Sequence, residues 1–448
     1  AEEVGMQRIS LPMVCVAAFV SGCGAGPASK TQEPIEEAIT ASPAALLEKY
    51  ERARAADTAG DTETFCRLTA ELVDSWPAHP RLILNLARCK VIEGDAESAL
   101  DVLDLLASMK IAVDLGKNAE LQSLAGQPRF AAIEKRIAAV DDPIVTSEVA
   151  FRLDDPEFVP EDIAWDSVSG DYFVSSIRQR KILRIGTDGG QSIFAGYPET
   201  PMLCALSMAV DPERRRLWLT TAGAPSMIDY RADEHEGASE LLAFDLDSGA
   251  LLATVPAPPN AERHELNDLI VEEDGAVLVG DAPVGAIYRY SLGGEGFEIV
   301  APPGTMFSPQ GIVVLPDGGG VVVADYSRGL CRLDPDGSVR VLRTPPDAWL
   351  GGIDGLSLAG NRELIAVQNG VAPSRVVRIV LTSDVDAVAS VEILDLAHPE
   401  HDQPTLGEIV GDEFLYVANS LWGAWDREGN LIEGRELSPP VILKIPLG

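Results

Sequence analysis

The chain has 448 residues, of which 46% are hydrophobic and 23% are charged, a composition typical of a globular protein with room for more than one hydrophobic core. It has 70 Asp and Glu residues against 35 Lys and Arg, which gives a formal net charge of −35 at pH 7. This charge argues against a nucleic-acid partner, because a phosphate backbone needs clustered Lys and Arg. It favours solubility and the attraction of cations.

The first predicted element is a signal peptide over residues 1–22. From Met6 the sequence has one basic residue, Arg8, and then an apolar run that is too short to span a bilayer but has the layout of a secretory signal. The run ends in "VSGC", which resembles the lipobox of bacterial lipoproteins and implies lipidation of Cys23. We therefore expect a lipid anchor on Cys23 in the bacterial cell envelope, at the outer membrane if the host has two, facing the periplasm or the exterior. An ordinary signal peptide that happens to contain a Cys is the alternative.

Residues 23–43 are small, polar and Pro-containing, which predicts a flexible tether.

Residues 44–141 show the helical period, with one helix pair divided at Gly60 and a second pair divided at residues 93–95. The second pair resembles a tetratricopeptide unit, in which the small residues Ala87 and Ala99 let the helices approach closely. About two repeats favour a packing role for this helical domain over a long binding groove, and a protein partner stays open as the alternative.

The six cysteines are scattered and include no CxxC pair. A bridge between Cys66 and Cys89 is one reading, but nothing local supports it. Buried thiols that act as small hydrophobic side chains are the favoured interpretation for all except Cys23.

Residues 142–448 consist of short predicted strands between Gly turns, and one four-residue phrase recurs in them. Its copies start 59, 46, 43, 46 and 66 residues apart and are "ILRI" (182–185), "LLAF" (241–244), "IYRY" (287–290), "LCRL" (330–333), "VVRI" (376–379) and "ILKI" (442–445). Two strands precede each copy and a fourth apolar strand follows most of them, which predicts a mainly β fold, a six-bladed β-propeller. The last unit lacks its fourth strand, so we expect "SEVAFRL" (147–153) to pair there and close the ring.

The residues that begin the inner strands are the candidates for a functional site. Aligning the units on their strand spacing places six residues at equivalent positions around one end of the central channel: Glu161, Leu206, Asn267, Gln310, Asp354 and Gly407. Four of them offer oxygen atoms. Each alone is most simply a turn residue, but two carboxylates and two amides that converge without a cation would repel one another. A calcium ion binds six to eight oxygens of this kind, so the ring predicts a divalent-cation site.

Four segments, "PEDIAWDSVSG", "LNDLIVEEDG", "SPQGIVVLPDG" and "GIDGLSLAGN", resemble in that order the senescence marker protein/gluconolactonase family, which is similar to paraoxonases and other calcium-dependent lactonases. The resemblance covers residues 147–448. It implies one divalent cation held by a glutamate, two asparagines and an aspartate, and it implies that the aspartate is also the general base. Glu161, Asn267 and Asp354 match this set, whereas the fourth position is Gln310, one methylene longer than the usual Asn.

Two neighbouring residues are candidates for substrate binding. Sugar-lactonase members of that family often carry Arg two places before the Asn of the third blade, whereas this chain has Glu265, which argues against an aldonolactone substrate. His264 lies beside it and is a candidate for proton transfer, although a lone histidine at a rim is more often solvated.

The predicted function is calcium-dependent hydrolysis of a lactone or other ester, with Asp354 deprotonating the attacking water. The alternative is a non-catalytic, NHL-like surface propeller that binds a protein or a glycan, and Gln310 and Glu265 favour it. Trp422, Trp425 and the insertion 222–240 belong to loops that either wall a pocket or only pack together. The motif "HPEH" (398–401) is interpreted as a surface turn.

Overall fold

The computed structural model describes residues 42–316, 320–426 and 428–448. The predicted signal peptide, Cys23 and all but the last residues of the predicted tether lie outside the described residues. Among the described residues, no helix is both long and apolar enough to cross a membrane.

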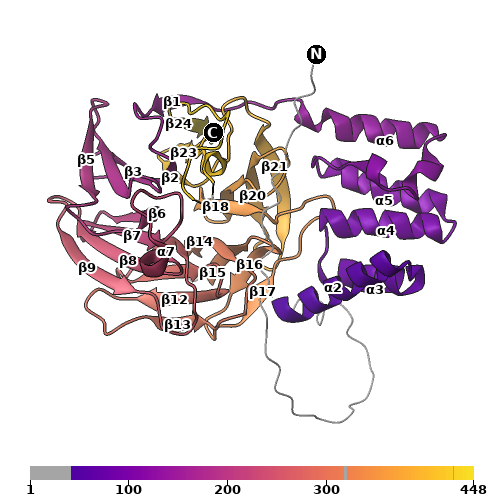
Figure 1. The fold of residues 1–448 in the computed structure, drawn as a ribbon, viewed down its shortest axis with the longest axis horizontal. Helices are drawn as coiled ribbons and strands as arrows, with labels where there is room; N and C mark the ends of the chain where they lie inside the picture. Colours follow the sequence, from indigo (N-terminus) through magenta and orange to yellow (C-terminus); the bar gives the residue numbers. More distant parts are fainter. Residues whose placement is uncertain (1–41, 317–319, 427) are drawn as a thin grey trace, which may run out of the picture. The chain divides into compact units, whose positions relative to one another are not determined.

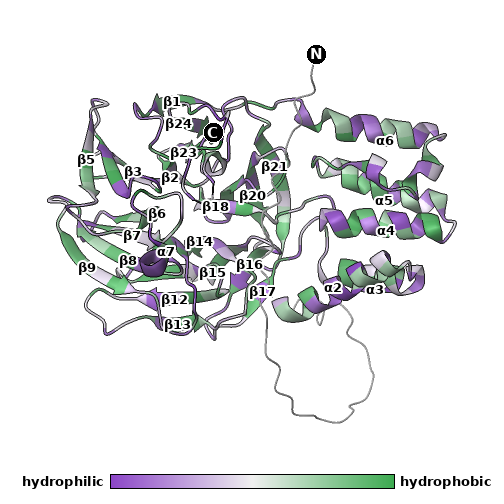
Figure 2. Cartoon of the chain, in the orientation of Figure 1, coloured by the Kyte–Doolittle hydropathy of each residue, from purple (hydrophilic) through white to green (hydrophobic). Residues whose placement is uncertain are grey.

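The N-terminal part of the described chain is helical (Figure 1). Its α-helices are α2 (Pro43–Ala59), α3 (Thr62–Ser75), α4 (Pro80–Ile92), α5 (Ala96–Ser108) and α6 (Pro128–Ala138). Polar side chains cap the first turns, since Ser42, Asp61 and Asp95 each accept a hydrogen bond from a backbone N–H three residues on. In Figure 2 hydrophobic and hydrophilic residues alternate along these helices, as expected for helices that each bury one face. Their tetratricopeptide-like character stays a prediction.

Close packing and one covalent bond hold the middle helices together. Ala87 of α4 and Ala99 of α5 are both fully buried, which agrees with a close approach of these two helices. Cys66 of α3 and Cys89 of α4 form a disulfide with a Cα–Cα distance of 5.4 Å. The interpretation of these two cysteines as free buried thiols was therefore wrong. It was wrong because their approach depends on how two separate helices pack, which local sequence does not reveal.

The remainder of the chain forms six four-stranded antiparallel sheets in the described residues, which confirms the predicted six-bladed β-propeller (Figure 1). Blades one and two contain β2 (Pro160–Trp165), β3 (Tyr172–Ser176), β4 (Lys181–Ile185), β5 (Gln191–Gly196), β6 (Cys204–Asp211), β7 (Arg216–Ala222), β8 (Ser239–Asp245) and β9 (Leu251–Pro256). Blades three and four contain β10 (Leu266–Val271), β11 (Val277–Asp281), β12 (Ala286–Tyr290), β13 (Glu298–Ala301), β14 (Pro309–Leu315), β15 (Gly320–Asp325), β16 (Gly329–Leu333) and β17 (Val339–Val341). Blades five and six contain β18 (Ile353–Leu358), β19 (Glu363–Gln368), β20 (Arg375–Leu381), β21 (Val388–Leu396), β22 (Gly407–Val410), β23 (Glu413–Val417), β24 (Val441–Pro446) and, from the start of the propeller, β1 (Glu148–Arg152). A short helix, α7 (Ala232–His235), lies in the insertion of blade two.

The ring is closed by strands from its two ends, as the sequence predicted. In blade six the strand order is β1-β24-β23-β22, and β1 pairs antiparallel with β24. A buried network reinforces the seam, because the carboxylate of Asp395 accepts hydrogen bonds from the backbone N–H of Thr146 and from the Tyr416 hydroxyl. The "HPEH" segment forms a turn that is closed by a hydrogen bond from the backbone N–H of His401 to the carbonyl of His398. Nε2 of His401 lies 3.0 Å from the same Tyr416 hydroxyl, so this turn also belongs to the network.

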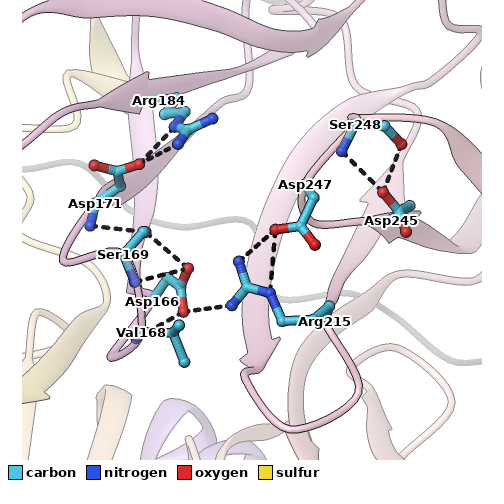
Figure 3. A network of polar contacts seen from close by, with 9 residues as sticks. All are labelled: Asp166, Val168, Ser169, Asp171, Arg184, Arg215, Asp245, Asp247 and Ser248. Atoms are coloured by element: carbon cyan, nitrogen blue, oxygen red, sulfur yellow. Dashed lines mark hydrogen bonds and ion pairs between the residues drawn. The ribbon is translucent and has the colours of Figure 1, made fainter.

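The basic residue at the third position of the recurring phrase has a structural role in every blade that carries it. Each of these side chains forms an ion pair with an acidic residue that lies on, or directly beside the end of, a strand of the same blade. Figure 3 shows the pair formed by Arg184 and Asp171 in blade one. The same figure shows Arg215 of blade two bridging Asp166 of blade one and Asp247, so that an ion pair also joins neighbouring blades.

We expect deletion of residues 441–448 to abolish cooperative unfolding of the propeller. The deletion removes β24, which is the partner of both β1 and β23, and would leave two strand edges unpaired. Thermal unfolding followed by circular dichroism checks this, with deletion of Gly448 alone as the control. A truncated protein that still melts in one sharp transition would contradict the role of the seam.

The ion pair of Arg215 predicts a pH-dependent contribution to stability. Burial raises the pKa of Asp166, but the ion pair with Arg215 and hydrogen bonds from Ser169 and Val168 outweigh it and lower the pKa to about 2. Because the folded pKa lies below the ordinary value of 3.8, this stabilisation is present above about pH 4 and is lost as the pH falls towards 2. We expect Arg215→Met to lower the free energy of unfolding by about 1 kcal/mol at pH 7 and by less near pH 2.

Urea unfolding of this variant at both pH values measures the difference. Arg184→Met, whose arginine pairs within one blade, is the control and should show a smaller change between the two conditions. An equal loss for Arg215→Met at both pH values would argue against the ion pair as the source of stability.

Candidate functional site at the channel mouth

A β-bulge places the candidate side chains in five of the six blades. Pairing between the inner strand and the second strand shifts register at the same point each time, between Pro160/Ile163, Ala205/Met208, Leu266/Leu269, Pro309/Ile312 and Ile353/Leu356. The skipped positions contain the five residues that the sequence alignment brought together, Glu161, Leu206, Asn267, Gln310 and Asp354. A bulge leaves a residue outside the ladder and re-aims its side chain. The polar residues are therefore tolerated at the start of buried strands because the bulge removes them from the pleat.

Blade six departs from the predicted alignment. In blade three, Asn267 lies two residues before Leu269, the first residue to resume pairing after the bulge. The corresponding residue of blade six is Gly407, so Thr405 and not Gly407 occupies the position equivalent to Asn267. The prediction for this blade was wrong by two residues. Thr405 and Leu406 both bond to the backbone of Val417, so the strand pairing of blade six begins before Gly407. The Thr405 hydroxyl donates a hydrogen bond of 2.5 Å to the backbone carbonyl of Glu161.

Two of the ring residues are carboxylic acids that influence each other. Glu161 is 9% exposed, and its Oε2 accepts a hydrogen bond of 2.6 Å from the indole of Trp422. Asp354 accepts a hydrogen bond on Oδ2 from the side-chain amide of Asn369. Burial raises the pKa of Asp354 to about 7, and burial together with the charge of Asp354 raises the pKa of Glu161 well above its ordinary value. The pair resists full ionisation at neutral pH unless a positive charge compensates it.

The two amides of the ring contact each other. The Nδ2 of Asn267 donates to Oε1 of Gln310, whose own Nε2 donates to the hydroxyl of Ser308 at 3.1 Å. The Oδ1 of Asn267 is buried and has no hydrogen-bond partner in the described part of the chain. A buried oxygen of this kind normally has a partner, so it indicates a place for a cation or a water.

The donor atoms around the ring suit a hard cation. The described residues contain no cluster of three or more His, Cys, Asp or Glu side chains that could hold a metal ion, so a cation at this point depends on amide oxygen as well as carboxylate. Carboxylate and amide oxygens together are the ligands that calcium accepts. Glu161, Asp354 and Oδ1 of Asn267 fit this requirement, whereas Oε1 of Gln310 already accepts the amide of Asn267.

His264 and Glu265 precede the ring residue of blade three and have different surroundings. His264 is buried, and its Nδ1 lies 2.6 Å from Oδ2 of Asp281, while its Nε2 is buried without a partner among the described residues. The interpretation of His264 as a solvated rim residue was therefore wrong. The Glu265 charge contributes to the raised pKa of both Glu161 and Asp354, so it adds negative potential beside the ring.

In blades one, two and three, the residue after the ring position joins neighbouring blades. Asp162 accepts a hydrogen bond of 2.7 Å from the backbone N–H of Met208, and Asp268 accepts one of 3.0 Å from that of Ile312. The hydroxyl of Ser207 contacts both carboxylates, at 3.2 and 2.7 Å. These groups line the central channel, a cavity of about 220 Å³. Asp268, which follows Asn267 in the sequence, is thus polar because it ties three blades together.

Sequence reasoning missed several polar residues that support the ring. Asn369 holds Asp354, and its Oδ1 accepts a hydrogen bond of 2.9 Å from the hydroxyl of Tyr326. Both residues follow the second strands of their blades, so aligning the ends of those strands would have placed them at this face. For Trp422 the sequence left a pocket wall and ordinary loop packing open, and its hydrogen bond to Glu161 places it beside a ring residue.

The chain is similar in structure to several known proteins, at low sequence identity. No protein-family model and no curated protein matches the chain. Among solved structures, the PQQ-bound aldose sugar dehydrogenase from Streptomyces coelicolor is 14% identical, covers 67% of this chain and 97% of its own, and has a TM-score of 0.49. A gluconolactonase from Xanthomonas campestris is 16% identical over 67% of this chain and 95% of its own, with a TM-score of 0.44. Virginiamycin B lyase from Staphylococcus aureus is 14% identical over 61% and 81%, with a TM-score of 0.44. At these identities the likeness carries no argument about activity.

The carboxylate pair predicts how stability depends on pH when divalent cations are removed. The folded pKa of Asp354 is raised, so the folded state binds a proton more readily and stability falls as the pH rises from about 4 towards 7. We expect Asp354→Asn to melt at a higher temperature than the wild type at pH 8 in EDTA, by about 4 °C or more, and to differ less at pH 5. Scanning fluorimetry at both pH values measures this. A variant that is less stable than the wild type at pH 8 would show that the carboxylates do not repel each other.

Proposed function

We propose that the propeller is a calcium-dependent hydrolase of a lactone or another ester, with its site at the channel mouth. The observation that carries the proposal is the convergence of two buried carboxylates and one unpartnered amide oxygen at equivalent bulges of three blades. The charges of such a group are costly without a cation, and no other use for the orphan oxygen is found among the described residues.

The residues that would hold the cation are Glu161, Asp354 and Asn267. Gln310 would orient Asn267, because its carbonyl oxygen receives the amide of that residue and leaves Oδ1 of Asn267 without a hydrogen-bond partner among the described residues. Trp422 and Asn369 each hold one oxygen of a carboxylate and leave the other oxygen unoccupied by these partners. A bound divalent cation would supply Lewis-acid chemistry, which polarises an ester carbonyl and lowers the pKa of water.

Asp354 is the proposed general base. A bound cation would oppose the rise of its pKa to about 7, so its carboxylate would accept a proton only from a water whose own pKa the cation lowers. Asn369 occupies Oδ2, so Oδ1 is the atom that takes the proton of the attacking water. That proton then passes to the alkoxide that leaves when the acyl C–O bond breaks, which returns Asp354 to its ionised form.

The surroundings favour an uncharged, partly apolar substrate. Blade two contributes Leu206 to the ring, and Leu206 packs in an apolar cluster with Met227, Trp422 and Trp425. Glu265 adds a negative charge where sugar lactonases often carry Arg, which disfavours an anionic or sugar-acid ligand. We therefore expect aliphatic lactones and esters to be better substrates than aldonolactones.

Location in the cell envelope is part of the proposal. The disulfide between Cys66 and Cys89 supports it, because such bonds persist in oxidising compartments outside the cytoplasm. The lipid anchor would be on Cys23, which lies outside the described residues. A protein partner of the helical region stays a proposal without a contact to support it.

Calorimetric titration of the protein with calcium tests the proposal directly. We expect saturable binding by the wild type, a loss of affinity of at least tenfold in Asp354→Ala, and little change in Asp247→Ala, which removes an exposed acid of the same charge that pairs with Arg215. A screen of aliphatic lactones, aldonolactones and simple esters then tests the chemistry. Absence of calcium binding by the folded wild type would contradict the hydrolase and leave a propeller that only binds a protein or a glycan.

A further inference from the structure

The helical region contacts the propeller at the loops that lead into the ring. Trp76, which directly follows α3, stacks on Phe307 with a centroid distance of 5.3 Å and an interplanar angle of 18°. Its indole Nε1 donates a hydrogen bond of 2.9 Å to the backbone carbonyl of Ser327. Phe307 lies three residues before Gln310, and Ser327 lies in the loop after the second strand of the same blade. One side chain of the helical region therefore contacts two separate loops of blade four.

Both loops carry a residue that holds a side chain of the ring. Ser308, next to Phe307, accepts the hydrogen bond from the side-chain amide of Gln310. Tyr326, next to Ser327, donates its hydroxyl to Asn369, the residue that binds Asp354. The two loops are also bonded to each other, since the backbone N–H of Tyr326 donates to the carbonyl of Ser308 at 2.9 Å.

A second set of contacts reaches the loop before Asp354. The ring of His79 lies 4.7 Å from that of Trp76 and 4.9 Å from that of Trp349. The buried Arg375 bridges the two regions, because it donates to the carbonyl of Met109 at 2.7 Å and to that of Trp349 at 3.1 Å. The helical region is therefore fixed to the loops that lead into two neighbouring ring positions.

These loops lie close together and are hydrogen-bonded to each other. The backbone N–H of Gly352 donates to the carbonyl of Tyr326 at 2.6 Å. A Cβ atom on Gly370 would lie 2.5 Å from the Cα of Gly352 and 2.7 Å from the hydroxyl of Tyr326. Gly352 precedes Asp354 by two residues and Gly370 follows Asn369, so a shift of Tyr326 must move both neighbours of the ring.

We propose that Trp76 is a positioning residue, and that the helical region is a rigid support that orients Asp354 through Tyr326 and Asn369 and orients Gln310 through Ser308. The orientation itself follows from the contacts above, and its effect on calcium rests on the proposed function. Outer-shell hydrogen bonds of this type usually change metal affinity by 10- to 100-fold. The helical region then has a role at the site although none of its own residues lies in the ring.

The test compares four forms of the complete protein: wild type, Trp76→Ala, Tyr326→Phe and Phe65→Ala. Phe65 is buried among the helices in a cluster that contains no propeller residue, so Phe65→Ala weakens the helical region without touching the loops. Hydrogen–deuterium exchange without calcium reports the loops directly. We expect faster exchange in the peptides that contain Tyr326 and Gly352 for Trp76→Ala and unchanged exchange there for Phe65→Ala.

Calcium titration supplies the second measurement. We expect the dissociation constant to rise about tenfold in Trp76→Ala and in Tyr326→Phe, and to stay within twofold in Phe65→Ala. The double variant should lose less affinity than the product of the two single losses, because both changes act along one path. Multiplicative losses, or loop exchange that is the same in Trp76→Ala and Phe65→Ala, would overturn the positioning role. Absence of calcium binding in the wild type would overturn the proposed function instead, and the exchange data would still decide the role of Trp76.

Discussion

The pairing of β1 with β24 is the constraint on which both the fold and the site depend. The six similar sheets bury their faces against one another. The last sheet has its fourth strand only because β1, from the start of the propeller, pairs with β24. The same seam assembles the site, because Glu161 belongs to blade one whereas its partners Thr405 and Trp422 follow the fifth blade. A ring that is open at this seam would lose the two contacts that hold the backbone carbonyl and the carboxylate of Glu161. Closure and the geometry of the site therefore have a common origin.

Within the closed ring, the β-bulge at the start of the inner strands places ring residues and blade-joining residues at two successive positions. The bulge occupies two positions of each inner strand. The first carries the side chains of the ring, and the second carries groups that join blades, such as Asp162 and Asp268. At the second position of blades four and five the residues are Gly311 and Gly355, where the neighbouring backbone approaches too closely for a Cβ atom. The inner strands of neighbouring blades therefore meet in two ways at this position. A carboxylate forms a hydrogen bond between the two blades, or a glycine lets the two backbones approach directly.

Two buried carboxylates at one site are electrostatically unfavourable, and neighbouring side chains hold both of them in place. Burial and mutual repulsion raise the pKa of Glu161 and of Asp354, and Glu265 adds to both effects. Side chains that cannot relax by moving into water need fixed partners, and here these come from Trp422, Asn369 and, through Tyr326, the loops against the helical region. The disulfide between α3 and α4 restrains the same helix pair whose turn presents Trp76. Supports of this kind extend from the ring to a part of the chain that precedes the propeller by many residues.

The sequence by itself determined the repeat, the closing strand and five of the six ring positions. Strand period, turn spacing and the recurring phrase are local patterns, so they can be recognised without knowing the tertiary structure. It predicted Glu161, Asn267 and Asp354 together for the same reason. Only the tertiary structure decided the rest. The backbone pairing of blade six placed Thr405 and not Gly407 at the ring position, helix packing brought Cys66 to Cys89, and burial paired His264 with Asp281. Asn369 and Tyr326 became part of the site through contacts between blades. Each of these depends on the distance between segments that are far apart in the chain, and no local pattern encodes that distance.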